Sequence, residues 1–317
     1  MSDRQVSPLT VPSMMRAVRL HPPGGPASLV LEDLATPKPG PGQALVRVFA
    51  AAITRGELDW PVDRLPAIPS YEFSGIVVAA ALDVTDTMVG EAVYALCPFD
   101  HDGAAADYTV VPSTSLAPKP RSLDHLRSAA VPLAGLSAWQ GLLDHGHLEQ
   151  GQRVLIHGAA GGVGSLAVQI AHHRGAHVIG TTSTANVAAV RELGVDQVID
   201  YTKTHFEDAL DSLDLVFDTV GGDRLQKSLE VLRSGGRLVS VAEEPPRAPA
   251  DSRGLTSLYF VVNPNRDQLR ALADLIDRGD LEPTVTEVFP LANARRAFER
   301  SLGRHGLGKI VLHLADE

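Results

Sequence analysis

The feature that most constrains this chain of 317 residues is a glycine-rich turn within residues 153–164, which read RVLIHGAAGGVG. A short apolar run at 153–157, typical of a β-strand, precedes the turn, and apolar residues at helical spacing follow it. Gly175 lies where that helix would end, and a second strand-like run follows at 176–182. A strand, a glycine turn and a helix in this order predict a binding site for a dinucleotide pyrophosphate, because the turn lets the phosphates approach the free amides of the helix.

Seven residues of the turn are the predicted phosphate contacts. They are Gly158, Ala159, Ala160, Gly161, Gly162, Val163 and Gly164. Their spacing is GxxGxxG instead of the strict GxGxxG, so the flanking strand and helix carry much of the argument. The alternative is a tight strand–helix turn of another α/β domain that binds no nucleotide.

Composition limits the classes of partner. The chain has 28 Lys and Arg against 38 Asp and Glu, and a net charge of −10 without a basic tract argues against nucleic acid. No apolar run approaches membrane-spanning length and residues 1–15 lack a signal-peptide pattern, so we expect a cytoplasmic protein away from membranes. The single cysteine, Cys97, excludes an intrachain disulfide, and we expect a small buried side chain there.

Residues 14–127 are rich in strand-like runs. These runs contain β-branched or small apolar residues, and Pro and Gly clusters separate them, which predicts a barrel-like or sandwich unit. They lie at 15–20, 29–34, 43–53, 74–80, 91–97 and 107–112. A helical stretch at 122–148 leads into the next unit.

Strand-like and helix-like segments alternate from residue 153 to residue 262, which predicts a doubly wound parallel sheet of six strands. The expected strands are 153–157, 177–182, 197–200, 213–220, 236–242 and 257–262, and the expected helices are 163–174, 185–193, 204–212 and 223–233. The Pro-rich segment 243–254 is expected to be a loop beside the cofactor crevice. Two more helices, 265–279 and 293–303, and a last strand, 309–314, are expected to return to the first unit.

Eight segments, in this order along the chain, resemble the medium-chain dehydrogenase/reductase superfamily, and most of all its zinc-independent quinone oxidoreductase (zeta-crystallin-like) branch. They are PGPGQALVRVFAAAI, IPSYEFSGIVV, AAVPLAGLSAWQGL, VLIHGAAGGVGSLAVQIA, LGVDQVIDY, VFDTVGGD, GGRLVSV and GLGKIVL. The resemblance implies an α/β protein with a GroES-like β-rich catalytic domain over 1–127, to which 263–317 return. It also implies a Rossmann NADP-binding domain over 128–262 and an active site in the cleft between the two.

The positions that bind catalytic zinc in the alcohol dehydrogenases of this superfamily are changed in this chain. Residues 51–56 read AAITRG and lack the Cys, and Tyr71 replaces the His in Ser70-Tyr71-Glu72. Zinc needs three or four ligands at defined spacing, and the 12 His of the chain are scattered, so we predict no metal. Without a Lewis acid, a quinone or an α,β-unsaturated carbonyl is the favoured hydride acceptor, because the charge spreads onto oxygen.

The end of the second strand, GTTST at 180–184, contains no acidic residue. An NAD site usually places Asp or Glu there to bind the ribose 2′-hydroxyl, so we predict NADPH over NADH. Ser183 lies where the acid would be and is predicted to face the 2′-phosphate, with a helix N-cap as its alternative role. The Lys that the family often adds nearby is missing, and Arg191 or Lys203 is the candidate for its charge.

The resemblance also implies the other cofactor contacts. Tyr201 is expected near the phosphates or ribose, Thr219 and Val220 beside a ribose, Val262 and Asn263 close to the nicotinamide, and Lys309 at the phosphates. An exposed surface lysine is the alternative for Lys309.

Three residues are the catalytic candidates, and two line the predicted substrate pocket. Thr54, Tyr71 and Ser137 are the catalytic candidates, and Asp59 and Trp60 are the pocket residues. The alternatives are a packed aromatic for Tyr71, a helix cap for Ser137 and a core or lid residue for Trp60. Glu72 is expected to be structural. Residues 53–60, ITRGELDW, depart from the usual motif of the branch, which leaves the donor to the substrate open.

An apolar edge strand such as 257–262 is an aggregation hazard unless it is paired. We therefore expect a homodimer through this strand, which the resemblance also implies. The predicted function is NADPH-dependent, zinc-independent hydride transfer to a quinone or enone. The alternatives are a dedicated biosynthetic enoyl or enone reductase and a non-catalytic NADPH-binding redox sensor.

Overall fold

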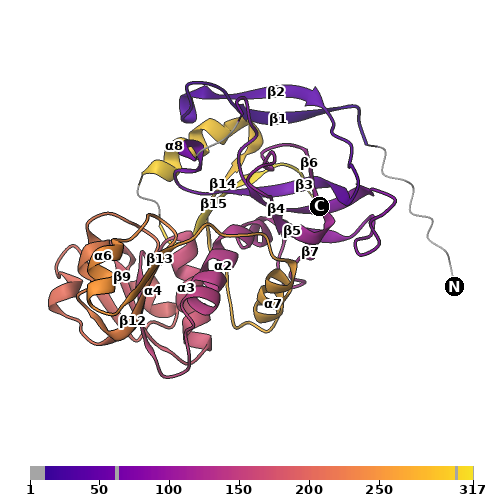
Figure 1. The fold of residues 1–317 in the computed structure, drawn as a ribbon. Helices are drawn as coiled ribbons and strands as arrows, with labels where there is room; N and C mark the ends of the chain where they lie inside the picture. Colours follow the sequence, from indigo (N-terminus) through magenta and orange to yellow (C-terminus); the bar gives the residue numbers. More distant parts are fainter. Residues whose placement is uncertain (1–10, 61–63, 304–305, 317) are drawn as a thin grey trace.

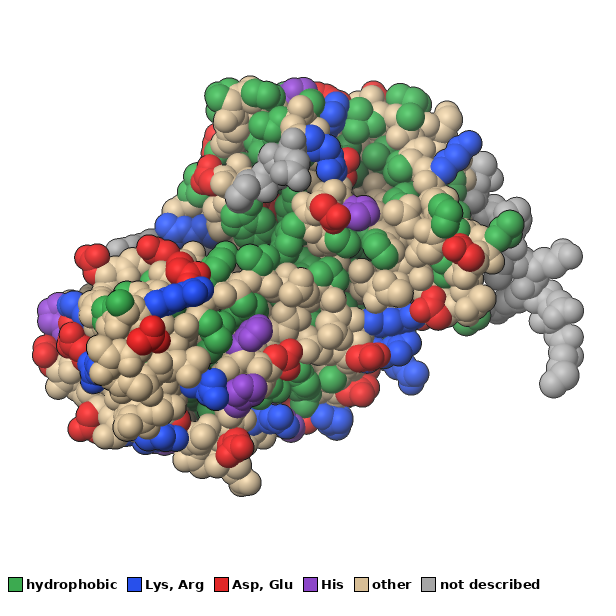
Figure 2. Space-filling model, viewed as in Figure 1, with side chains coloured by type: hydrophobic (Ala, Val, Ile, Leu, Met, Phe, Trp, Pro, Cys, Tyr) green, Lys and Arg blue, Asp and Glu red, His purple; other side chains and the backbone are tan. Residues whose placement is uncertain are grey.

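The computed structural model describes residues 11–60, 64–303 and 306–316, which form two large sheets and a small hairpin (Figure 1). The hairpin consists of the antiparallel strands β1 (Met14–Leu20) and β2 (Leu29–Ala35), drawn at the top of Figure 1. On the face drawn in Figure 2, hydrophobic side chains gather along the boundary between the upper and lower parts of the molecule. The fold thus has the predicted α/β class.

The first large sheet has seven strands, centred on β3 (Gln43–Ile53). Its other members are β4 (Glu72–Ala80), β5 (Ala92–Leu96), β6 (Tyr108–Pro112), β7 (Ala117–Pro118), β14 (Val285–Pro290) and β15 (Lys309–His313). β15 pairs with β3 in antiparallel register, with Ile310 opposite Ile53. The late strand therefore returns to the first sheet, as the sequence predicts, and brings residues near 309 to the end of β3.

The second large sheet is parallel and has the strand order β10-β9-β8-β11-β12-β13. Its strands are β8 (Arg153–His157), β9 (His177–Thr182), β10 (Gln197–Asp200), β11 (Leu213–Asp218), β12 (Leu232–Ser240) and β13 (Thr256–Tyr259). The chain winds outward from β8 on one side and from β11 on the other. The predicted six-stranded, doubly wound sheet is confirmed, and the carboxyl ends of β8 and β11 meet at its switch point, where such sheets bind ligands.

Most helices lie around the parallel sheet or between the two large sheets, whereas the last one lies in the upper part of the molecule, beside β2 and β14 (Figure 1). They are α1 (His125–Ala129), α2 (Pro132–Trp139), α3 (Gly162–His173), α4 (Val187–Glu192), α5 (Arg224–Ser228), α6 (Arg247–Ser252), α7 (Arg266–Asp277) and α8 (Ala294–Leu302). A π-helix, Gln140–His145, continues α2. α2 contacts α3 and α7 as well as β4 and β5 of the first large sheet, and one apolar core extends through both parts of the molecule.

Four local predictions are wrong, each for a structural reason. Instead of the helix expected at 204–212, only the 3-10 turn Phe206–Asp208 forms. The amides of Lys203 and Thr204 just before it both donate to the Asp200 carbonyl, which forms a turn there. The helix expected at 223–233 ends at Ser228, because Leu232 already pairs with β11. The expected loop 243–254 contains α6, since prolines are tolerated in a first helical turn, where amides need no partner. β13 ends at Tyr259, before the expected strand end at 262.

Candidate active site

The glycine turn packs too tightly for side chains at two of its positions. Gly158 has a φ of 74°, and a Cβ there would lie 2.6 Å from Thr219 Oγ1. A Cβ on Gly164 would lie 2.1 Å from the Gly158 carbonyl oxygen, so the first turn of α3 lies directly on the glycine turn. Small residues are thus required for the backbone to fold back under the helix.

The N-terminus of α3 is suited to a pyrophosphate. The helix has 12 residues, its N-cap is Gly161, and no side chain caps it. The amides of its first turn, together with the positive end of the helix dipole, therefore offer donors to an anion, and the absence of a Cβ at Gly158 and Gly164 leaves main chain alone to form the cradle. The residues present fit the phosphates of a dinucleotide.

The far end of the predicted cofactor site contains an acid that the sequence argument overlooked. Asp200 ends β10 and lies opposite Thr182 in the sheet register. Its carboxylate accepts hydrogen bonds from Thr184 Oγ1 at 2.6 Å and from Thr202 Oγ1 at 2.7 Å, and these bonds lower its pKa. Lys203 Nζ lies 3.3 Å from the same carboxylate. Asp200 belongs to β10 and not to β9, and the parallel pairing of the two strands brings this acid beside the end of β9.

Ser183 and Tyr201 lie at the same end of the sheet. Ser183 is half-buried and precedes the 3-10 turn Thr184–Asn186, but its side chain makes no capping bond, so the helix-cap alternative is not realised. Tyr201 is 51% exposed, and its amide donates to the Thr182 carbonyl. Both side chains are accessible to a ligand.

Near the switch point, the predicted cofactor residues divide into exposed and buried ones. Thr219 Oγ1 donates to the His157 carbonyl at 2.7 Å, while Val220 is exposed. Val262 is buried, and the main chain of Asn263 is held by the side chain of Gln140. The Gln140 amide donates to the Asn263 carbonyl at 2.8 Å and accepts from its N–H at 3.1 Å.

Gln140 is a residue that the sequence argument missed. Its side chain takes the place of a neighbouring strand for Asn263, whereas β13 stops at Tyr259 because its partner β12 ends opposite it, at Ser240. Nothing in the sequence marks this glutamine, because its partner lies 123 residues further along the chain.

The buried residues Lys309 and Glu72 and the half-buried Thr54 form a polar cluster where β3, β4 and β15 meet. Lys309 Nζ donates to Thr54 Oγ1 at 2.8 Å and lies 2.5 Å from Glu72 Oε1. Lys309 is 7% exposed, so the surface alternative for this lysine is wrong. The other Glu72 oxygen accepts from the Leu133 amide in the first turn of α2 at 2.8 Å, which fits the structural role expected of Glu72.

A second buried acid, Glu57, belongs to the same cluster and was not predicted. Its two oxygens accept from the Thr54 and Ser70 amides, each at 2.8 Å. Burial raises the pKa of Glu57 to about 7, against the opposing effects of the two amides and of Lys309. Asp59 is the acid predicted from this loop, yet Asp59 is exposed and Glu57 is the acid that is buried.

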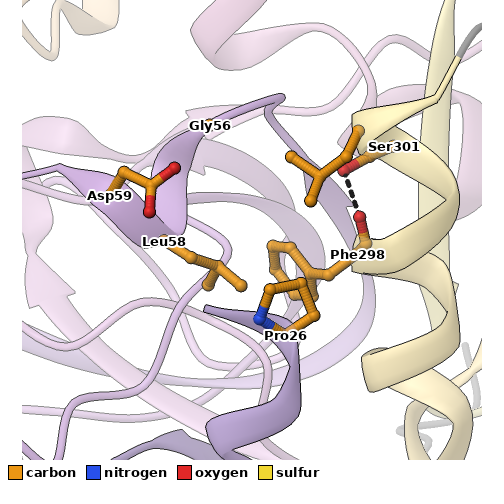
Figure 3. A pocket seen from close by; sticks show the side chains of 7 residues that line it. Pro26, Gly56, Leu58, Asp59, Phe298 and Ser301 are labelled. Atoms are coloured by element: carbon orange, nitrogen blue, oxygen red, sulfur yellow. Dashed lines mark hydrogen bonds between the residues drawn. The ribbon is translucent and has the colours of Figure 1, made fainter. Parts of the chain in front are cut away.

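The two predicted pocket residues point to different places. Trp60 packs against Tyr71 and Phe99, with ring centroids 6.1 Å and 5.4 Å away. Asp59 lies instead on a small cavity of about 80 Å³ between the turn Glu57–Asp59 and α8, which Phe298 and Ser301 line from the far side (Figure 3). The structure therefore does not bring Trp60 and Asp59 together in one pocket.

Tyr71 is buried in this aromatic group. Burial, and next the charge of Glu57, raise its pKa to about 12, so its hydroxyl keeps its proton at neutral pH. Its packing with Trp60 and Phe99 matches the packed-aromatic alternative. Ser137 is also buried and lies well inside α2, so the helix-cap alternative for Ser137 is wrong.

Two kinds of site are absent from residues 11–60, 64–303 and 306–316. No three His, Cys, Asp or Glu side chains among those residues come together as a metal site. None of the described helices combines the length and apolar character needed to cross a bilayer. Independence from metal stays a prediction, which metal analysis of the purified protein tests.

Comparison with known proteins adds to this geometry. The alcohol dehydrogenase GroES-like domain matches residues 40–121, and a zinc-binding dehydrogenase family matches residues 193–312. An NADPH-dependent alkenal/one oxidoreductase of Arabidopsis thaliana, named as chloroplastic, is 33% identical over 324 residues, which cover 96% of this chain and 81% of the relative. A 2-haloacrylate reductase of a Burkholderia species is also 33% identical, over 94% of this chain and 99% of the relative.

Solved structures give the same assignment. The quinone oxidoreductase from Coxiella burnetii has a TM-score of 0.87 at 31% identity, covering 95% of this chain and 100% of its own. A quinone oxidoreductase from Pseudomonas syringae has the same TM-score at 26% identity, covering 94% and 99%. From its two matched domains, its sheet order and these relatives, the chain is an oxidoreductase of the medium-chain dehydrogenase/reductase superfamily, in the branch that contains the quinone oxidoreductases.

Proposed function

We propose that this protein is an NADPH-dependent oxidoreductase that transfers hydride to a quinone or an α,β-unsaturated carbonyl compound without a metal. One observation carries the proposal. Lys309 runs from the glycine turn to the end of β3, where its ammonium group donates to Thr54. A hydroxyl donor and a dinucleotide cradle therefore lie at opposite ends of one buried side chain.

The chemistry of a conjugated acceptor suits these residues. A reduced nicotinamide supplies the hydride when it is bound. The residues of the chain then orient the acceptor and stabilise the negative charge that develops on its oxygen, where one or two hydrogen-bond donors suffice. Thr54 is the candidate donor, and Ser137 and Tyr71 are the others. The rings of Trp60 and Phe99 offer apolar surface for a planar acceptor.

The relatives support this acceptor class. The Arabidopsis relative is named for alkenals and alkenones, and the Burkholderia relative for 2-haloacrylate, all of which contain a carbon–carbon double bond conjugated to a carbonyl group. The Coxiella structure is named for quinones, the other conjugated acceptor.

NADPH consumption with a panel of quinones, alkenals, alkenones and acrylates tests the proposal. We expect turnover with at least one acceptor. The product should be saturated at the former carbon–carbon double bond for an alkenal, alkenone or acrylate, and should be the hydroquinone for a quinone. Activity should persist after treatment with a chelator. A single accepted compound would favour the dedicated enoyl or enone reductase. NADPH binding without consumption across the whole panel would favour the redox sensor and contradict our proposal.

The preference for NADPH over NADH rests on the end of β9, where Ser183 replaces an acid. Asp200 is nearby, but Thr184 and Thr202 already bind its carboxylate. Comparing kcat/KM for the two cofactors measures the preference directly. The variant S183D should reduce it tenfold or more, because a carboxylate repels the 2′-phosphate, whereas S183N should reduce it less.

A homodimer in the cytoplasm is also part of the proposal. β13 is the edge strand of the parallel sheet, and the exposed side chains of Tyr259 and Val261 lie along and beyond it. Size-exclusion chromatography with light scattering should give twice the mass of one chain, and a monomer at micromolar concentration would contradict the dimer. Cell fractionation tests the location.

A further inference from the structure

The stem of Lys309 is fixed against the glycine turn. A Cβ on Gly162 would lie 2.3 Å from Lys309 Cδ, so the lysine stem occupies the space that a side chain at residue 162 would take. The residue before the lysine, Gly308, forms a β-bridge with Gly161, and its amide donates to the Ala160 carbonyl at 3.0 Å. Lys309 is therefore anchored in the nucleotide half of the site, although it begins a strand of the other sheet.

The head of Lys309 determines where the Thr54 hydrogen can point. An ammonium group has three donors and no acceptor, so Thr54 Oγ1 must be the acceptor in the 2.8 Å bond. The hydroxyl retains its single hydrogen, and within the described residues this hydrogen has no acceptor. Thr54 is half-buried and thus partly accessible. Its hydrogen is held away from Lys309 and is available to an acceptor that enters from outside.

Two buried acids fix this arrangement from separate sides. Glu72 holds the ammonium group of Lys309, and Glu57 holds the main-chain amide of Thr54. Glu72 is fixed in turn by the Leu133 amide and Glu57 by the Ser70 amide. The ammonium group of Lys309 and the main chain of Thr54 are thus each bonded to a buried carboxylate.

We propose that Lys309 is a positioning residue that directs the Thr54 hydroxyl hydrogen toward the oxygen of the hydride acceptor. This inference rests on the function proposed above and adds the identity of the donor and of the group that aims it. Thr54 touches the substrate, and Lys309 acts only through Thr54. The donor needs no rotation when charge develops on the acceptor oxygen, which is the condition for preorganised stabilisation.

The test is a cycle of variants at the two positions. K309M alone leaves two buried acids uncompensated and can fail to fold, so the charge-neutral variant E72Q/K309M is the one to use. T54V should lower kcat by about 100-fold, as expected for loss of a preorganised donor. E72Q/K309M should lower kcat by about tenfold, because the hydroxyl is then free to rotate. The triple variant T54V/E72Q/K309M should be no slower than T54V, since Lys309 has nothing left to aim.

Three controls separate positioning from general damage. T54S and K309R keep a hydroxyl and a donor and should stay within a few-fold of the wild-type kcat. NADPH affinity, measured by fluorescence titration, should change less than threefold in T54V and E72Q/K309M. K227M, which removes the lysine bound to Glu207 at the outer surface of the parallel-sheet part, should leave kcat unchanged.

Two results would overturn the inference. One is a fall in kcat caused by E72Q/K309M that is as large in the T54V variant as in the wild type, because Lys309 and Thr54 would then act independently. The other is unchanged kcat in E72Q/K309M. Both require an active wild-type protein, so they are distinct from failure of the proposed function, in which the wild type itself consumes no NADPH with any acceptor.

Discussion

The two halves of the candidate site are built by different means. The nucleotide half consists of main chain: at Gly158 and Gly164 a side chain would meet other atoms at under 3 Å. The donor half consists of side chains, namely Glu57, Glu72 and Lys309, all of which are buried. A site made of backbone is damaged by adding atoms, and a site made of buried charges is damaged by removing one.

The largest expected effect is removal of one charge from the donor half. E72A leaves the Lys309 ammonium group buried without its carboxylate, and it should lower the free energy of unfolding by about 3–5 kcal/mol. Urea denaturation of the purified protein measures this loss. The matched control is E207A, which removes the partner of the half-exposed Lys227 and should cost at most about 1 kcal/mol. Equal losses in the two variants would contradict the difference between buried and surface pairs.

A buried histidine in the nucleotide half should make the folded protein less stable in acid. His157 ends β8 and is fully buried between Thr181 and Ser228, and burial, and next Arg224, lower its pKa to about 3. The unfolded chain takes up the proton near pH 6.5, so this contribution is present above pH 6.5 and is lost as the pH falls toward 3. Thermal melts should show a fall in Tm between pH 7 and pH 5 that is smaller in H157Q. An unchanged fall in H157Q would assign the acid sensitivity elsewhere.

A buried acid in the donor half should have the opposite effect, and should make the folded protein less stable as the pH rises. Glu57 has a pKa of about 7 in the folded protein against 4.5 as its ordinary value. Its contribution to stability is therefore present below pH 4.5 and is lost as the pH rises to 7, by up to about 3 kcal/mol. Guanidinium titrations at pH 5 and pH 8 give the difference in unfolding free energy, which E57Q should reduce. The same difference in E57Q and wild type would show that Glu57 does not cause it.

A methyl group in the nucleotide half should have a smaller effect on stability. The Cβ of G164A would lie 2.1 Å from the Gly158 carbonyl oxygen, and we expect a loss of about 1–3 kcal/mol together with weaker NADPH binding. The control is G161A in the same turn, whose Cβ would lie 3.2 Å from the same oxygen. Calorimetric melting and NADPH titration should both rank G164A as the more damaged variant. The reverse ranking would argue against the close packing of α3 on the turn.

The smallest expected effect is a gain. Ser70 has a φ of 65°, and its buried hydroxyl has no hydrogen-bond partner among the described residues. S70G should relieve the backbone strain of a left-handed serine and should remove the unpaired hydroxyl. We expect the free energy of unfolding to rise by about 1 kcal/mol. S74G should instead lose stability, because the Ser74 hydroxyl donates to the Val93 carbonyl at 2.9 Å. A lower free energy of unfolding in S70G would contradict this prediction and would mean that the Ser70 side chain stabilises the fold.

The same contrast explains what the sequence could predict. The glycine turn, the six-stranded sheet and the return of β15 were predicted, because each follows from residues that are close in the chain or from strands counted in order. The bounds of helices and loops are less predictable. Pro246 and Pro249 suggest a loop, yet both fit the start of α6.

Contacts between distant residues were beyond reach. Thr54 and Lys309 were singled out separately, but nothing in the sequence says that they bond to each other across 255 positions. Glu57 and Gln140 were missed for the same reason, since an inward-pointing side chain looks like a surface one until its partner is placed. Asp200 was missed because it ends β10, whereas the acid of an NAD site is expected at the end of β9.

The pairing of β15 with β3 has a consequence for how the protein is made. A ribosome synthesises Thr54 long before Lys309, so the parallel sheet can form while the hydroxyl still lacks the ammonium group that aims it. A nascent chain halted after α8 would hold every strand of the nucleotide-binding sheet and yet have no complete donor. On this view, the Thr54 hydroxyl gains its orientation only after β15 has been synthesised and has paired with β3.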